Sequence, residues 1–309
     1  MPRMNRILPW LLLLVLGIIW GTNFLFMKLA VAVIPPLEVA WLRTLFGAVP
    51  IAGFALGTRA LNRRDWRHLH HFTAMALLAN VGPYVFFVLG TQHLPSGIAG
   101  VISGAIPFIT AGVVAVALPA EVLTRSKLIG IAVGFAGVVL VAPLGQTGPQ
   151  HAGASPLLGV AAMLSGSLSY ALALVYAKRF VSPLKMGAVR LAAYQMVIAF
   201  ILMIPFAAPG HWNALTAHPT ALLALVIGLG LLGTGIAFVI YYYLIAQLGA
   251  LKAASVYYIP PVVALAVGAA FAGEAAGLRQ IAGALLIMAG IFYANRPERN
   301  AAKVVKEPT

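Results

Sequence analysis

Polar and aromatic side chains of the kind that bind small molecules lie inside segments that are otherwise apolar. In the stretch "GIIWGTNFLF", residues 17–26, a threonine and Asn23 follow Trp20. Trp20, Asn23 and Met27 are spaced by three and four positions, so they share one face of a helix. A polar amide in hydrocarbon raises the free energy unless a partner bonds to it. Asn23 therefore either lines a polar cavity or bonds a neighbouring helix.

A second set of polar residues lies on either side of a proline in the stretch "ANVGPYVFF". Pro83 lacks the N–H of a regular helix and predicts a kink that frees a backbone carbonyl. Asn80 and Tyr84 lie one turn apart beside it. We expect either a cavity there or a neighbouring helix that bonds the freed carbonyl.

Two further bends are predicted in "ISGAIPF" and "SVYYIPP". Pro107 and Pro260 lie at the bends, with Ser103 before the first and Tyr257 and Tyr258 before the second. Aromatic and hydroxyl groups beside a bend suit a gate or a substrate wall, and static curvature is the alternative. The stretch "SGSLSYALALVY" adds two serines and a tyrosine to this set. The candidate substrate-binding residues are Trp20, Asn23, Asn80, Tyr84, Ser103, Ser165, Ser169, Tyr170, Tyr257 and Tyr258. The candidate hinges are Pro83, Pro107 and Pro260.

The positions of the charged residues narrow the chemistry of such a cavity. We expect Arg43 and Arg190 near the membrane surface, with Glu38 in reach of Arg43's surroundings; gate charges are the alternative. Glu121 and Glu274 fall at predicted helix ends, where the helix dipole favours a carboxylate. With no charge expected at mid-membrane, the pocket suits a neutral or zwitterionic molecule better than a cationic drug or a phosphate ester. The tyrosines at 241–243 are expected to anchor at the interface.

The elements that must position these residues are membrane helices. The chain has 309 residues, of which 62% are hydrophobic and 8% charged, and no cysteine. Such a chain has the bilayer as its solvent. Long apolar runs without alternation predict helices. The expected spans are 7–28, 37–57, 71–91, 97–119, 127–144, 156–177, 187–208, 219–245, 253–272 and 278–294.

The basic residues predict the orientation of these spans. With the N-terminus in the cytoplasm, 17 of the 20 Lys and Arg residues fall in cytoplasmic stretches. The positive-inside rule therefore predicts that both termini are cytoplasmic.

The two halves of the chain resemble each other. Four residue pairs are 153 positions apart: Pro107 and Pro260, Glu121 and Glu274, Gly130 and Gly283, Gly137 and Gly290. Five spans per copy reverse the direction of the second copy. We therefore predict an all-α integral membrane protein of ten transmembrane helices in two inverted five-helix repeats, 1–150 and 151–309. Earlier in the halves the offset is 150, which pairs Lys28 with Lys178 and Trp20 with Tyr170.

"WGTNF", "PPLEVAWLR" and the repeated Pro…Glu…Gly…Gly pattern resemble the drug/metabolite transporter superfamily, and within it the ten-helix EamA-type exporters. The resemblance covers nearly the whole chain. It implies a central cavity open to each side in turn, and export of amino acids or similar metabolites, as in bacterial aromatic amino acid exporters.

The predicted function is thus a secondary transporter that exports small neutral or zwitterionic metabolites, amino acids above all. A multidrug, nucleoside or nucleotide-sugar carrier is the alternative. The sequence lacks the paired membrane aspartates or HExxH of intramembrane proteases, so an enzyme is not expected, and neither is a channel. The expected partners are a small-molecule substrate and the lipid bilayer, without nucleic acid, metal or cofactor. A monomer is expected, with a dimer left open.

Overall fold

Apolar runs form helices along the whole described chain. The computed structural model describes residues 7–117, 125–142, 155–207, 209–248, 253–275 and 277–294, and these residues contain no strand. The helices of the first half are α1 (Leu8–Val31), α2 (Pro36–Gly57), η2 (Arg63–His68), α3 (Leu69–Ala76), η3 (Leu77–Val81), α4 (Gly82–His93), α5 (Ser96–Ser103), α6 (Ile106–Ala117) and α7 (Arg125–Val141).

The described residues of the second half also form helices. Its helices are α8 (Pro156–Tyr176), η5 (Ala177–Val181), η6 (Ser182–Leu184), α9 (Ala188–Met203), η7 (Ile204–Phe206), η8 (Pro209–His211), α10 (Trp212–Thr216), α11 (Pro219–Leu223), η9 (Ala224–Ile236), α12 (Ala237–Leu248), η10 (Ala254–Tyr258), α14 (Pro260–Phe271) and α15 (Leu278–Ala294).

The lengths of these helices identify a multi-pass membrane protein. Within the described ranges, seven continuous helical segments are long and apolar enough to cross a bilayer, and Ser255–Phe271 and Leu278–Ala294 are shorter apolar helices. Each of the ten predicted spans contains a described helix, α7 being the fifth. The all-helical fold class is therefore confirmed.

Several of these segments depart from regular α-helix at places the sequence marks with proline or glycine. The π-helix η3 precedes Pro83, and the π-helix η9 contains the glycine-rich run of the eighth span. The fourth span breaks between α5 and α6, just before Pro107. The ninth begins as the 3₁₀-helix η10 and becomes α14 at Pro260.

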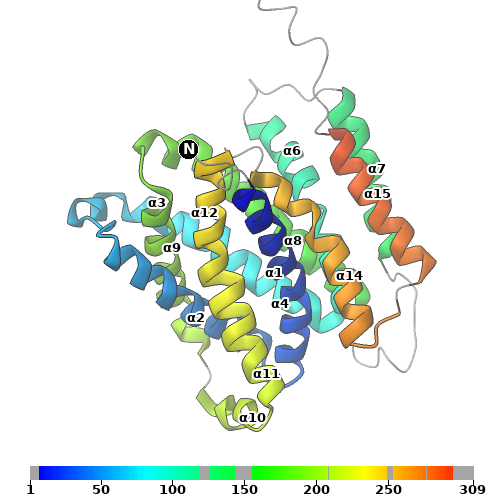
Figure 1. Cartoon of the computed structure of the whole chain (residues 1–309), viewed down its shortest axis with the longest axis horizontal. Helices are drawn as coiled ribbons and strands as arrows, with labels where there is room; N and C mark the ends of the chain where they lie inside the picture. Colours follow the sequence, from blue (N-terminus) through cyan, green and yellow to red (C-terminus); the bar gives the residue numbers. More distant parts are fainter. Residues whose placement is uncertain are drawn as a thin grey trace, which may run out of the picture.

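Close helix packing depends on glycine at two contacts. A methyl group placed on Gly17 or Gly21 of α1 would overlap the side chains of Ile259 and Val263, so α14 approaches the backbone of α1 closely. Helices α7 and α15 lie side by side at one edge of the bundle (Figure 1). Gly130 packs against Gly290 and Gly137 against Gly283, so the two helices run antiparallel.

The corner between α4 and α5 is held by two charged side chains. The Glu274 carboxylate accepts hydrogen bonds from the backbone N–H groups of Ser96 at 2.6 Å and Gly97 at 2.7 Å. It thus caps α5 and not the helix that follows it in sequence. Lys28 Nζ donates to the carbonyls of Thr91 at 3.0 Å and Leu94 at 3.1 Å, at the end of α4.

Candidate functional site

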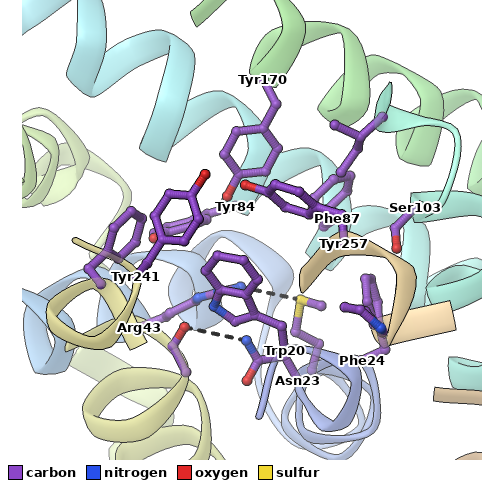
Figure 2. A pocket seen from close by; sticks show the side chains of 15 residues that line it. Trp20, Asn23, Phe24, Arg43, Tyr84, Phe87, Ser103, Tyr170, Tyr241 and Tyr257 are labelled. Atoms are coloured by element: carbon purple, nitrogen blue, oxygen red, sulfur yellow. Dashed lines mark hydrogen bonds between the residues drawn. The ribbon is translucent and has the colours of Figure 1, made fainter. Parts of the chain in front are cut away.

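A cavity of about 100 Å³ lies where the interrupted helices meet. It is lined by residues from both halves of the chain, and Figure 2 shows the labelled side chains pointing toward one another around it. The lining residues are Trp20, Asn23, Phe24, Met27, Arg43, Tyr84, Phe87, Ser103, Ile106, Tyr170, Gly233, Phe238, Tyr241, Tyr257 and Pro260. Of the predicted binding residues, the structure thus brings together Trp20, Asn23, Tyr84, Ser103, Tyr170 and Tyr257.

Three aromatic rings form one wall of the cavity. Trp20 stacks on Tyr257 with ring centroids 5.4 Å apart, and its centroid lies 5.4 Å from that of Tyr241. The Tyr241 and Tyr257 rings meet edge to face at 6.4 Å. Aromatic faces arranged in this way attract an ammonium group or an apolar side chain.

The side-chain amide of Asn23 has a partner across the bundle. Its Nδ2 donates to the carbonyl of Gly233 at 3.5 Å, and Gly233 lies in the π-helix η9. A methyl group on Gly233 would overlap Asn23, so only glycine admits the amide here. Asn23 therefore bonds a neighbouring helix and also lines the cavity. Thr22 bonds its own helix, through the carbonyl of Ile18 at 2.8 Å.

Arg43 corrects the expectation of an uncharged pocket. Its side chain is only 6% exposed and lines the cavity. Its Nε donates to Thr234 Oγ1 at 3.0 Å, and its Cζ lies 4.0 Å from the centroid of the Tyr84 ring. Helix α2 packs along η9, and Arg43 is buried in the cavity wall there, so its side chain does not snorkel to the surface as expected.

The kink at Pro83 is satisfied by a neighbouring helix. In η3 the N–H of Gly82 bonds the carbonyl of Leu77, five residues back. The next bond in that register would join Leu78 to Pro83, which has no N–H. Ser169 Oγ of α8 donates to this Leu78 carbonyl at 2.8 Å. Ser169 therefore supports the kink and is not on the cavity wall.

Three other predicted residues also lie away from the wall. Asn80 is fully buried behind Tyr84, and its Nδ2 lies 3.5 Å from the Tyr84 hydroxyl. Ser165 lies on α8, one turn before Ser169, and Tyr258 packs against the main hydrophobic core. Pro107, one of the predicted hinges, occupies the first turn of α6 and is not among the residues that line the cavity.

Tyr241 is predicted at the interface but lies in the cavity wall. Met27 lines the cavity on the helix face that it was predicted to share with Trp20 and Asn23. Phe24, Phe87 and Phe238 also line the cavity and were not predicted to do so. For Phe24 a signal is present, because it follows Trp20 by four positions on the same face.

Glu38 and Arg190 bond to other parts of the protein, away from the cavity. Glu38 pairs with His211 Nδ1 at 3.0 Å, and not with the surroundings of Arg43 as expected. Arg190 donates to the carbonyl of Ala60 at 2.6 Å and lies 3.6 Å from Asp65. Glu121 lies outside the described residues.

Comparison with known proteins agrees with this architecture. The model of the EamA-like transporter family matches residues 8–142 and 157–296. A solved crystal structure that is 21% identical has a TM-score of 0.62 and covers 95% of this chain and 97% of its own, so the fold is shared.

Similar sequences carry transporter names. An "Uncharacterized inner membrane transporter YedA" of Escherichia coli K12 is 32% identical over 88% of this chain and 86% of its own length. A "Probable amino-acid metabolite efflux pump" of Salmonella typhimurium is 28% identical over 91% and 92%. With both halves matched, this chain belongs to the EamA-like transporter family, in the drug/metabolite transporter superfamily.

Proposed function

We propose that this transporter exports small neutral or zwitterionic metabolites, amino acids above all, as a secondary carrier. The observation that supports this most is the cavity itself. It lies between the two halves of the chain, at four helix interruptions, and it combines aromatic faces with few polar groups. Carriers place their substrate sites at such interruptions near mid-membrane.

The aromatic wall suits the ammonium group or the side chain of an amino acid. Trp20, Tyr241 and Tyr257 offer ring faces, while Tyr84, Ser103 and Tyr170 supply hydroxyl groups. The amino-acid metabolite named for the Salmonella relative is in keeping with this chemistry. A multidrug or nucleoside-type cargo remains the second candidate, because the many aromatic side chains also accept flat apolar molecules.

We propose that transport follows alternating access between two inverted repeats, residues 1–150 and 151–309. Two contacts between α7 and α15 support the inverted relation. In the repeat alignment Gly130 corresponds to Gly283 and Gly137 to Gly290. Exchanging the two copies turns the Gly130–Gly290 contact into the Gly283–Gly137 contact, which is also present. A two-fold relation between the copies has this property.

The broken helices at Pro107 and Pro260 are the proposed moving elements, with Pro83 as a third hinge. We also propose that both termini lie in the cytoplasm. The protein is proposed to act as a monomer, since the cavity is built within one chain.

Reconstitution in vesicles tests the transport proposal. Purified protein in liposomes loaded with one amino acid should accumulate the same labelled amino acid from outside by counterflow. A panel of amino acids, nucleosides and cationic dyes then separates the candidates. Exchange of the dyes or nucleosides but of no amino acid would contradict the proposed substrate class.

A further inference from the structure

The cavity contains one charged group whose role neither the fold nor the family name explains. Arg43 is the only charged residue among the residues that line the cavity. Within the described part of the chain no carboxylate pairs with it, since the ion pairs there join other residues. A buried cation without an anion is costly in a membrane, and such residues usually serve a ligand.

The contacts of Arg43 hold its guanidinium in place without using all of its donors. Thr234 accepts from Nε at 3.0 Å, and Met27 Sδ lies 3.7 Å from Nη1. The Tyr84 ring covers one face of the group at 4.0 Å. A guanidinium has five N–H donors, and among the described residues none accepts from the two on Nη2.

Arg43 is one of the residues that line the space where a substrate would lie. Figure 2 shows Arg43 among the side chains that surround this space, together with Trp20 and Tyr241. A carboxylate is the anion that a single guanidinium binds best in a planar, charge-assisted contact. A phosphate monoester carries nearly twice the charge and is usually met by more than one cation.

We infer that Arg43 binds the carboxylate of the transported molecule, so that the carrier selects carboxylates over the corresponding amides and esters. This inference rests on the proposed transport function and names the group that fixes the substrate's orientation. The carboxylate binds at Arg43, and the rest of the molecule contacts the rings of Trp20, Tyr241 and Tyr257. A neutral amide leaves the guanidinium unpaired and binds more weakly.

Matched ligand pairs test the inference on the unmodified protein. Each pair is a carboxylic acid and its primary amide, such as phenylalanine with phenylalaninamide and 3-phenylpropionate with 3-phenylpropionamide. Binding is measured by ligand-induced thermal stabilisation in detergent, and transport by competition in vesicles. The acid should bind at least about ten-fold more tightly than its amide, as expected for a charge-assisted bond.

Arginine variants assign the preference to one residue. Arg43→Gln should reduce the preference for acid over amide to about three-fold or less, and Arg43→Lys should keep part of it. Arg190→Gln is the matched control. Arg190 corresponds to Arg43 at an offset of 147, as Pro183 does to Pro36, but it lies outside the cavity. Its ratio of acid to amide affinity should equal that of the unmodified protein.

The outcomes separate this inference from the proposed function. If amino acids are exchanged but acid and amide compete equally in the unmodified protein, the inference is overturned and the transport function stands. If only the simple carboxylates are bound, the inference stands and the amino acid proposal fails. If Arg43→Gln folds, as judged by its melting curve, and keeps the full preference, Arg43 is not the carboxylate site.

Discussion

The aromatic wall of the cavity depends on Trp20, which contacts both of its tyrosines. Its ring lies 5.4 Å from Tyr241 and 5.4 Å from Tyr257. Aromatic contacts and cation–π pairs are each worth about 0.5–1.5 kcal/mol. Trp20→Ala should therefore raise the KM for an exchanged amino acid about two- to ten-fold, measured by counterflow in vesicles.

Trp10 provides the control for this prediction. It lies on the same helix but is 50% exposed and outside the cavity. Trp10→Ala should leave KM unchanged. Equal effects of the two substitutions would mean that Trp20 acts through the stability of α1 and not through the cavity.

The type of a polar residue inside a span predicts only part of its role in this protein. Asn23 has both of its predicted roles, because its side-chain amide bonds the carbonyl of Gly233 and also lines the cavity. The polarity of Ser169 and Asn80 also predicted cavity positions. Ser169 instead bonds the backbone at the kink, and Asn80 lies within bonding distance of the Tyr84 hydroxyl. A polar residue in a span needs a partner, but residue type alone does not say whether the partner is protein or substrate.

At the scale of the helix, the kink in the third span depends on a hydroxyl of the sixth. Ser169 Oγ bonds the Leu78 carbonyl that Pro83 leaves free. Ser169→Ala should lower the free energy of unfolding by about 1–3 kcal/mol, since a buried carbonyl loses its partner. Thermal or denaturant unfolding in detergent measures the change.

Ser165 offers a matched substitution one turn earlier on α8. Within the described residues it makes no hydrogen bond across the bundle. Ser165→Ala should change stability by less than about 0.5 kcal/mol. If Ser169→Ala is equally mild, the carbonyl has found another partner and the assigned role of Ser169 is wrong.

The α4–α5 corner is a second place where one element depends on a side chain from another. Glu274 accepts from the backbone N–H groups of Ser96 and Gly97, which begin α5, at 2.6 and 2.7 Å. Glu274→Gln removes the charge and should lower the free energy of unfolding by about 1–2 kcal/mol, because these bonds are charge-assisted. Glu274→Asp, which keeps the charge, should retain part of that stability. A melting temperature unaffected by Glu274→Gln would exclude this capping role.

For the whole molecule, the inverted repeat makes a prediction about sidedness. Arg125 begins α7 and Leu278 begins α15, and the two positions are 153 apart. Since α7 and α15 are antiparallel, their first residues lie at opposite ends of the pair. The chain has no cysteine, so Arg125→Cys and Leu278→Cys each introduce a single label site.

An impermeant thiol reagent applied to intact cells should label only Leu278→Cys, on the periplasmic side. The cysteine at 125 should be labelled only in inside-out vesicles. Labelling of both from the same side would refute the inverted arrangement and, with it, the alternating-access proposal.

The sequence alone determined the class of the protein and the positions of its main helices. These follow from hydropathy along the chain, because a fixed bilayer thickness demands about 20 apolar residues per span. Prolines and glycines marked the interruptions, since they act on the local backbone. The three-dimensional arrangement decided which side chains share the cavity. Arg43 and Tyr241 join it because α2 and α12 pack against helices from distant parts of the chain, and local composition does not determine this packing.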